Sequence, residues 1–190
     1  MILALIGPHG VGKTSLGERL AARLHLPFDE ELGRALAADP AWRPAGATAA
    51  DAAARFDEEL FGRELSRDLR RGAQPRVVET WHLGNLAYAA RRSPEVVAAW
   101  RAQLRTHCGG QPALILPLLA PREVLARRQN EAGDLSFFIE VGEDARRWAD
   151  ALGLPCLPPV DTSQAPPEQL AADLATKLNF LVQPQHRSLR

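Results

Sequence analysis

Eight residues near the N-terminus, 7–14, form a complete G-x-x-x-x-G-K-[ST] pattern, which is typical of loops that bind nucleotide phosphates. Its glycines allow successive backbone N–H groups to curl around phosphate oxygens, and a helix that begins in the loop adds its positive dipole end. We expect Lys13 to reach the β- and γ-phosphates and the Thr14 hydroxyl to ligate Mg²⁺. The residues predicted to bind the nucleotide are Gly7, Pro8, His9, Gly10, Val11, Gly12, Lys13, Thr14 and Ser15.

The sequence around this pattern predicts the elements that a phosphate-binding loop requires. The apolar run 2–6 predicts a buried strand before the loop, and Leu16, Leu20 and Leu24 form one apolar stripe of a helix after it. The alternative is a glycine-rich turn that only packs a helix on a strand. The order strand, loop, helix favours the phosphate-binding interpretation.

Two carboxylates follow the next two predicted strands. Residues 26–28 lead into Asp29, and residues 76–78 lead into Glu79. Because ligands bind at the carboxyl ends of parallel strands, both acids are predicted to be catalytic, and Glu79 is also predicted to ligate the metal with Thr14. Phosphoryl transfer needs such a metal ligand and a base that orients the acceptor. The alternative for each acid is a solvated loop carboxylate, or a helix N-cap for Asp29.

Four arginines flank a segment around Gly133 that separates two predicted helices: Arg127, Arg128, Arg146 and Arg147. A mobile arm that carries an arginine would stabilise the charge on a transferring phosphoryl group and exclude water. We therefore predict that residues 127–138 are mobile without ligands and become ordered when both substrates bind. Arg128 is the predicted catalytic arginine, and the alternative is a solvated helix face.

Strand-like and helix-like stretches alternate along the whole chain, which predicts an α/β fold with a parallel sheet of about five strands flanked by helices. Residues 114–116 predict another buried strand. Residues 155–160 predict an edge strand, because a central strand would not tolerate Pro158 and Pro159.

The remaining pattern predicts helices, one long loop and a single domain. Residues 39–50 are rich in proline, glycine and alanine and predict a loop. Helices are predicted over residues 56–69, from a capping Ser93 onward, over 134–152 and over 170–181. Residues 1–182 are expected to form one domain, and residues 183–190 a loose tail.

The amino-acid composition indicates which partners and which cellular location to expect. Acidic and basic residues balance at 23 each, so we expect neither a nucleic-acid polymer nor a membrane as partner. Lys13 and Lys177 are the only lysines, which makes a lysine in the phosphate-binding pattern conspicuous. Cys108 and Cys156 are expected to be small buried hydrophobic residues. No apolar run approaches 18 residues, and we expect a cytoplasmic monomer or homodimer.

Together these patterns resemble the small P-loop kinase family, which includes thymidylate, deoxynucleoside and shikimate-type kinases. The phosphate loop matches in full, and residues 28–30 are similar to the acidic strand end that meets the acceptor in that family. Residues 79–88 resemble a stretch that begins with an acid–arginine pair and continues with an aromatic residue and Leu-Ala-Tyr. Residues 121–128 resemble the helix before an arginine-bearing lid, and residues 160–163 resemble the turn that approaches adenine. The resemblance implies a P-loop NTPase fold with an arginine-bearing lid.

One departure from the family concerns the acceptor. Thr80 stands where the family usually has the arginine that helps to hold phosphate. This substitution favours a neutral acceptor over a monophosphate. Phe28, Asp29, Trp81 and Tyr88 are the predicted substrate-binding residues, because aromatic rings can stack on a planar ligand. The alternative for the rings is packing in the core.

The predicted activity is ATP- and Mg²⁺-dependent transfer of the γ-phosphoryl group to a small-molecule acceptor, with a nucleoside or nucleoside monophosphate as the first choice. Catalysis would rest on positioning and electrostatics. One alternative is a kinase for a non-nucleotide hydroxyl compound such as a sugar, a sugar acid or an antibiotic. Another is an ATP-dependent switch without a small-molecule acceptor. The sequence does not distinguish ATP from GTP.

Overall fold

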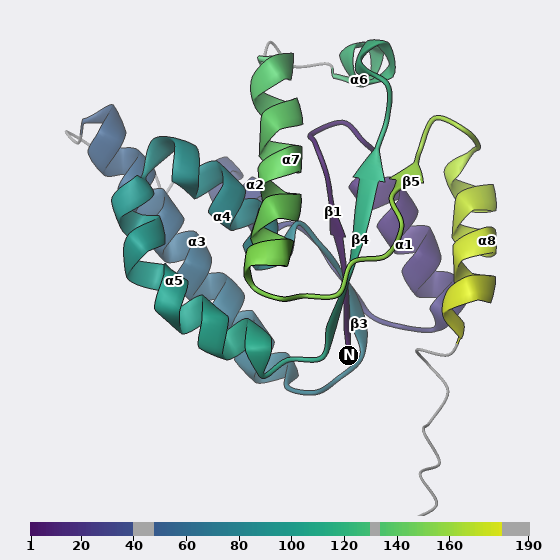
Figure 1. Ribbon diagram of the computed structural model, residues 1–190, viewed down its shortest axis with the longest axis horizontal. Helices are drawn as coiled ribbons and strands as arrows, with labels where there is room; N and C mark the ends of the chain where they lie inside the picture. Colours follow the sequence, from purple (N-terminus) through teal and green to yellow (C-terminus); the bar gives the residue numbers. More distant parts are fainter. Residues whose placement is uncertain (40–47, 130–133, 180–190) are drawn as a thin grey trace, which may run out of the picture.

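The computed structural model describes residues 1–39, 48–129 and 134–179. In this part of the chain five parallel strands form one sheet in the order β2-β3-β1-β4-β5, with helices on both faces (Figure 1). The predicted fold class is therefore confirmed. The strands are β1 (Ile2–Ile6), β2 (Phe28–Asp29), β3 (Arg76–Glu79), β4 (Ala113–Leu119) and β5 (Val160–Asp161). The predicted tail, residues 183–190, lies outside the described residues.

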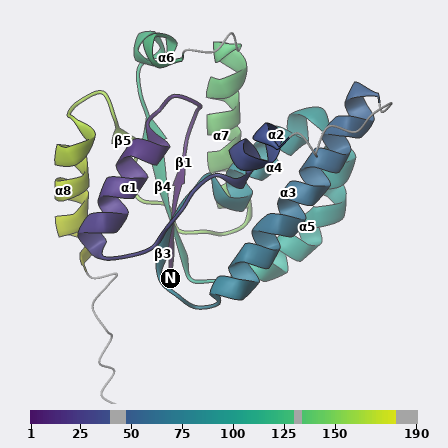
Figure 2. The same cartoon turned by 180° about the vertical axis from the view of Figure 1, so that it is seen from behind.

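Eight helices occur among the described residues: α1 (Lys13–Leu24), α2 (Leu32–Ala38), α3 (Ala49–Arg71), α4 (Trp81–Arg92), α5 (Pro94–Gly109), α6 (Arg122–Arg128), α7 (Leu135–Ala151) and α8 (Pro167–Leu178). Figures 1 and 2 show α1 and α8 side by side on one face of the sheet, and α4 and α7 on the other. Both faces are therefore covered, which explains why β1 is apolar at every position. None of the described helices combines the length and the apolar character that a membrane crossing requires.

The two faces of β1 contribute to two different hydrophobic clusters. Leu3 and Leu5 pack with residues of α1 and α8, whereas Ile2, Ala4 and Ile6 pack with residues of α4 and α7. This alternation follows from the two-residue period of a strand. The central strand that leads into the phosphate loop is thus fixed from both sides.

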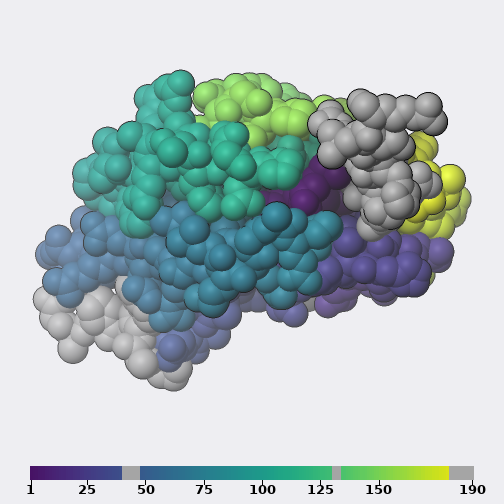
Figure 3. Space-filling view, turned by 90° about the horizontal axis from the view of Figure 1, so that it is seen from below, coloured from purple at the N-terminus to yellow at the C-terminus, as the bar shows by residue number. Residues whose placement is uncertain are grey.

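A second layer of helices supports α4. Figure 3 shows α3 and α5 lying side by side across the lower surface of the molecule. Phe61 of α3 stacks on Trp100 of α5, with ring centroids 5.6 Å apart, within a cluster that also contains Leu86 and Ala89 of α4. This layer holds the helix that directly follows Glu79.

Some predicted boundaries are wrong. The predicted loop 39–50 ends earlier, because α3 begins at Ala49, and the Thr48 hydroxyl accepts a hydrogen bond from the backbone N–H of Asp51 at 3.1 Å. Residues 40–47 of this loop lie outside the described residues. Ser93 precedes α5 as predicted, but its hydroxyl donates to the Asp57 carboxylate at 2.8 Å and does not cap the helix.

The edge strand and the helix predicted over residues 134–152 are present. β5 pairs with β4 through Val160 and Asp161 at the edge of the sheet, and it is shorter than predicted. Helix α7 has a glycine in its middle, because a Cβ atom at Gly142 would lie 2.7 Å from the ring of Pro8. The small residue lets α7 rest directly against the phosphate loop.

Candidate active site

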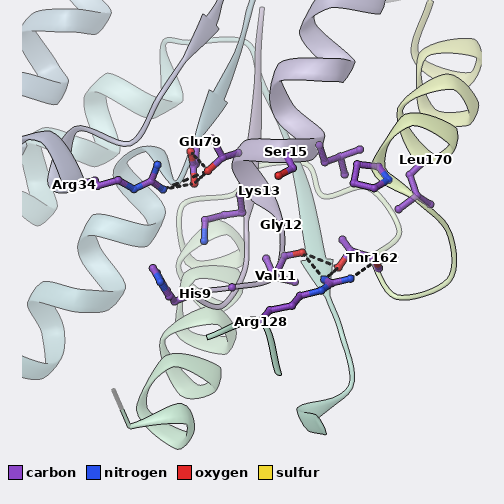
Figure 4. Close-up of a pocket in the computed structure, with 14 residues that line it drawn as sticks. His9, Val11, Gly12, Lys13, Ser15, Arg34, Glu79, Arg128, Thr162 and Leu170 are labelled. Carbon is purple, nitrogen blue, oxygen red and sulfur yellow. Dashed lines mark hydrogen bonds and ion pairs between the residues drawn. The ribbon is translucent and has the colours of Figure 1, made fainter. Parts of the chain in front are cut away.

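A cavity of about 610 Å³ lies beyond the carboxyl ends of β1 and β3, the edge at which parallel sheets bind ligands. Most of its floor is the phosphate loop, which we define as residues 7–15. The other walls include Arg34 of α2, Glu79 of β3, Arg128 of α6 and Thr162 after β5. Figure 4 shows Arg34 and Glu79 on one side of the loop, with Arg128 and Thr162 on the other.

Two glycines allow the loop to adopt its path. The backbone of Gly7 has a φ of 146°, and a Cβ atom there would lie 2.4 Å from the carbonyl oxygen of Leu118. Gly12, with a φ of 95°, directly precedes the first residue of α1. Positive φ values favour glycine at these positions. The loop therefore turns tightly from β1 into the N-terminus of α1.

Lys13 is buried at the centre of the site. Its Nζ atom donates to the carbonyl oxygens of Gly7 and Pro8, each at 3.1 Å. Burial lowers the pKa of the lysine, and the nearby charges of Glu31 and Glu79 oppose this shift. A phosphate group would supply the negative charge that favours the ammonium form.

Thr14 and Glu79, the two predicted metal ligands, are in direct contact. The Thr14 hydroxyl lies 3.0 Å from each carboxylate oxygen of Glu79. Burial raises the pKa of Glu79 against the opposing charge of Lys13, and the carboxylate is only 2% exposed. Two residues that are 65 positions apart in the sequence thus place three oxygen atoms at one point of the cavity.

Arg34 is a site residue that the sequence analysis missed. Its Nη2 atom lies 3.2 Å from Glu79 Oε1 and 3.3 Å from Thr14 Oγ1. The same atom lies 3.6 Å from Glu31 Oε2. Arg34 belongs to the seven-residue helix α2, which was not predicted. The spacing of Leu32 and Leu36 at i and i+4 was the available signal for this helix.

Arg128 lines the cavity from the side opposite Arg34. Its guanidinium donates to Oγ1 and the carbonyl oxygen of Thr162 at 2.9 and 3.0 Å, and it lies 3.4 Å from the carbonyl oxygen of Val11. Thr162 in turn donates to Val11 at 2.7 Å. These bonds join α6, the turn after β5 and the phosphate loop. Residues 130–133 of the predicted lid lie outside the described residues, and its mobility stays a prediction.

Two predicted substrate-binding residues, Phe28 and Asp29, do not line this cavity. The ring of Phe28 packs against α1, where a Cβ atom at Gly17 would lie 2.5 Å from the ring. Asp29 is buried and forms ion pairs with Arg71 at 2.6 Å and with Arg76 at 3.2 Å. Two arginines therefore already neutralise this carboxylate, which gives it a structural environment.

Trp81 is also placed away from the cavity. Its ring is fully buried, and its Nε1 atom donates to Asp68 at 2.9 Å, so the ring offers no free face for stacking. Thr80, at the position of the missing family arginine, has a φ of 68° and packs against Gly84, where a Cβ atom would lie 2.3 Å from Thr80 Cγ2. The side chain at position 80 thus faces α4.

Tyr88 lies at one end of a row of half-buried aromatic rings. Its centroid is 6.0 Å from that of Phe137, which is 5.6 Å from that of Phe138. Phe138 lies 5.1 Å from the ring of His9 in the phosphate loop. The sequence analysis did not single out the two phenylalanines as site residues, although they are the last two residues of the predicted lid, 127–138.

Comparison with known proteins agrees with this architecture. No protein-family model matches the chain. A segment of 41 residues, 20% of the chain, is 51% identical to shikimate kinase from Colwellia psychrerythraea, and the match spans 24% of that protein's length.

Among solved structures, deoxyadenosine kinase from M. mycoides with bound dATP matches with a TM-score of 0.67 and 11% identity, over 94% of this chain and 99% of that one. NadR in complex with NR matches with a TM-score of 0.65 and 17% identity, over 94% of this chain and 51% of that one. These structural matches show that the chain has the fold of these proteins, which is the fold of the P-loop kinases.

Proposed function

We propose that this protein is a kinase that transfers the γ-phosphoryl group of ATP, with Mg²⁺, to a small-molecule acceptor. The observation that carries the proposal is the convergence of Lys13, Thr14 and Glu79 at the floor of one cavity. Phosphoryl transfer needs a phosphate cradle, a cation and a metal ligand in this arrangement. The fold shared with kinases supports the same conclusion.

The nucleotide is proposed to bind across the phosphate loop, with its base toward Thr162 and the start of α8. Pro167 and Leu170 supply apolar surface on that side of the cavity. Lys13 would bind the β- and γ-phosphates in place of the loop carbonyls that it now contacts. Arg128 would act on the transferring phosphoryl group after leaving its bonds to Thr162 and Val11.

The residues present fit Mg²⁺. The Thr14 hydroxyl and the Glu79 carboxylate are hard oxygen donors, and their contact at 3.0 Å allows both to reach one ion. Burial raises the pKa of Glu79, because nearby positive charges only partly offset the loss of solvent around the carboxylate. A bound cation would favour the charged carboxylate. When bound, the ion would neutralise charge on the β- and γ-phosphates.

The acceptor is proposed to bind between α2, α4 and α7, next to the row of rings from His9 to Tyr88. A planar base can stack on such half-buried rings. Arg34 lines the cavity on the same side, and its Nη2 atom lies 3.6 Å from Glu31 Oε2. The pairing of Asp29 with two arginines gives its predicted role as acceptor base little support. A nucleoside is therefore the first choice of acceptor, in line with the dATP and NR bound by the similar structures.

A second candidate acceptor is a non-nucleotide hydroxyl compound. The 41-residue match to shikimate kinase favours it, because the name of that relative specifies a hydroxylated carboxylic acid as its substrate. The Arg34 guanidinium, with half of its side chain exposed, is a suitable partner for such a carboxylate.

The direct test is a thermal-shift screen followed by detection of the product. The protein is incubated with Mg²⁺ and a non-hydrolysable ATP analogue, and nucleosides, nucleotides, sugars and hydroxy acids are added one at a time. Compounds that raise the melting temperature further are then incubated with ATP, and the phosphorylated product is identified by ³¹P NMR. A phosphorylated nucleoside supports the first choice, and a phosphorylated hydroxy acid supports the second. Absence of any shift with the ATP analogue would contradict the proposal.

A further inference from the structure

Arg34 occupies an unusual place for a cation on a short surface helix. Its Nη2 atom lies 3.2 Å from Glu79 Oε1 and 3.3 Å from Thr14 Oγ1, the two groups proposed to ligate Mg²⁺. Figure 4 shows the Arg34 side chain directed at Glu79, near Lys13. A guanidinium group therefore sits where the proposed metal site requires a divalent ion.

An ordinary surface ion pair does not account for this position. The side chain of Arg34 is 52% exposed, whereas that of Glu79 is 2% exposed, so a solvated arginine is directed at a buried carboxylate. Lys13, the other cation near Glu79, donates its bonds to the carbonyl oxygens of the loop. Arg34 is thus the cation in direct contact with the Glu79 carboxylate in the described part of the chain.

Arg34 and a metal ion cannot both occupy this point. Mg²⁺ coordinated by Thr14 and Glu79 would lie next to the Nη2 atom that now contacts both residues, and two cations at such a distance repel each other. Glu31, whose carboxylate is 3.6 Å from the same Nη2 atom, offers a second partner one helical turn away. The arginine therefore has one acidic partner at the metal site and another beside it.

We infer that Arg34 is a displaceable cation that holds Thr14 and Glu79 in position until the metal–nucleotide complex binds. Metal binding then moves the guanidinium to Glu31, on the acceptor side of the cavity. Arg34 is thus a positioning residue that couples metal binding to completion of the acceptor site. The inference rests on the proposed function, since it uses the proposed metal ligands.

The test measures metal affinity, so that it does not depend on an identified acceptor. Binding of Mn²⁺ is followed by the loss of the free-ion EPR signal, with the protein in molar excess over a non-hydrolysable ATP analogue, so that little free analogue remains to bind Mn²⁺ itself. Arg34→Gln should bind Mn²⁺ about 5-fold more tightly than the unmodified protein, the size expected when one partner of an ion pair is solvent-exposed. Arg63→Gln is the matched control, because Arg63 pairs with Glu59 on the surface of α3, and its affinity should be unchanged.

A double-mutant cycle with Glu31 separates displacement from simple charge effects. Glu31→Gln should weaken Mn²⁺ binding, because the displaced arginine loses its second partner. If displacement operates, the same substitution should have a clearly smaller effect in the Arg34→Gln background. Two results would overturn the inference in a protein that still binds the ATP analogue. One is an equal effect of Glu31→Gln in both backgrounds, and the other is an equal Mn²⁺ affinity of Arg34→Gln and the unmodified protein. If the unmodified protein fails to bind the ATP analogue, the proposed function is overturned, and the inference falls with it.

Discussion

Two buried carboxylates near β3, Glu79 and Asp68, have opposite electrostatic environments. Burial raises the pKa of Glu79, and its hydrogen-bond donors are one hydroxyl and one half-exposed arginine. Burial also acts to raise the pKa of Asp68, but hydrogen bonds from His107, His82 and Trp81 outweigh it and lower the pKa far below its usual range. The number of donors, more than burial, decides which carboxylate is stably charged.

The surroundings of Asp68 are those of a completed structural network. Its Oδ1 atom accepts from the buried Arg76 at 2.7 Å, and its Oδ2 atom accepts from Trp81 at 2.9 Å. His82 and His107 place Nε2 atoms 3.2 and 2.9 Å from the same Oδ2. These three groups are close enough to share a metal ion, but hydrogen bonds already account for their spacing. Asp68 therefore ties α3 to β3, α4 and α5, whereas Glu79 is left with capacity for a ligand.

Replacement of Asp68 should have the largest effect on stability and therefore gives the strongest test of this comparison. We expect Asp68→Asn to lower the free energy of unfolding by about 3–5 kcal/mol, because the buried Arg76 would lose the nearer of its two carboxylate partners and keep only its ion pair with Asp29 at 3.2 Å. The hydrogen bonds from Trp81, His82 and His107 would also lose their charged acceptor. Urea denaturation measures the change. The exposed Asp173 of α8 provides the control, since Asp173→Asn should change stability by less than about 0.5 kcal/mol. A loss below about 1 kcal/mol for Asp68→Asn would show that the network is not structural.

Replacement of Lys13 should instead reduce activity and leave stability unchanged. Lys13→Ala is expected to lower turnover by a factor of about 100 to 1000, equivalent to roughly 3–4 kcal/mol, because the charge that binds the transferring phosphoryl group is lost. Stability should be maintained, since burial disfavours the charged lysine in the free protein. Lys177→Ala removes the exposed second lysine and should leave both quantities unchanged. Normal turnover of Lys13→Ala would refute the assignment of the phosphate loop.

Glu79→Gln should reduce turnover by roughly 10- to 100-fold, an effect of about 1.4–2.7 kcal/mol, because a metal ligand loses its charge. Added Mg²⁺ should restore part of the rate. A Mg²⁺ titration of the initial rate, run beside the surface variant Glu59→Gln, measures both effects. If the rate of Glu79→Gln does not depend on Mg²⁺ concentration, Glu79 is not a metal ligand.

The two carboxylates should also respond differently to pH. The raised pKa of Glu79 means that the folded protein binds its proton more tightly, so Glu79 destabilises the fold as pH rises above the ordinary value of 4.5. The stability of Glu79→Gln relative to the unmodified protein should therefore increase from pH 4 to 7. The contribution of Asp68 to stability should change with pH in the opposite direction. Because its pKa is lowered, this contribution is present above pH 3.8, the ordinary pKa value, and is lost as the pH falls below it. Urea denaturation at several pH values distinguishes the two, and parallel pH profiles would contradict the comparison.

Local patterns in the sequence were sufficient to predict the fold and the position of the phosphate loop. A strand buried on both faces is a continuous apolar run, and the loop motif has a fixed spacing, so both can be recognised without tertiary information. Glu79 was predicted as a site residue because it stands at the end of a predicted strand. Helix α2 was missed because seven residues give too short a period, and Arg34 was missed with it.

Pairs of distant residues account for the site features that the sequence did not reveal. Asp29 has the same position after a strand as Glu79, but Arg71 and Arg76 neutralise it from α3 and β3. The burial of Trp81 depends on Asp68, which precedes it by 13 positions and lies in another helix. Such partners become visible only when the helices are packed, because a sequence pattern carries no information on which charges meet.

The close approach of α7 to the phosphate loop makes Gly142 a position where stability and activity are in conflict. A glycine within a helix costs about 1 kcal/mol relative to alanine, so a search for stabilising substitutions would select this position early. The added methyl group would have to displace Pro8, 2.7 Å away, and with it the backbone that Lys13 contacts. Since α7 begins at Leu135, within the predicted lid, one helix connects that segment to the loop. Laboratory evolution for heat resistance alone would therefore tend to improve this helix at the expense of the loop beneath it.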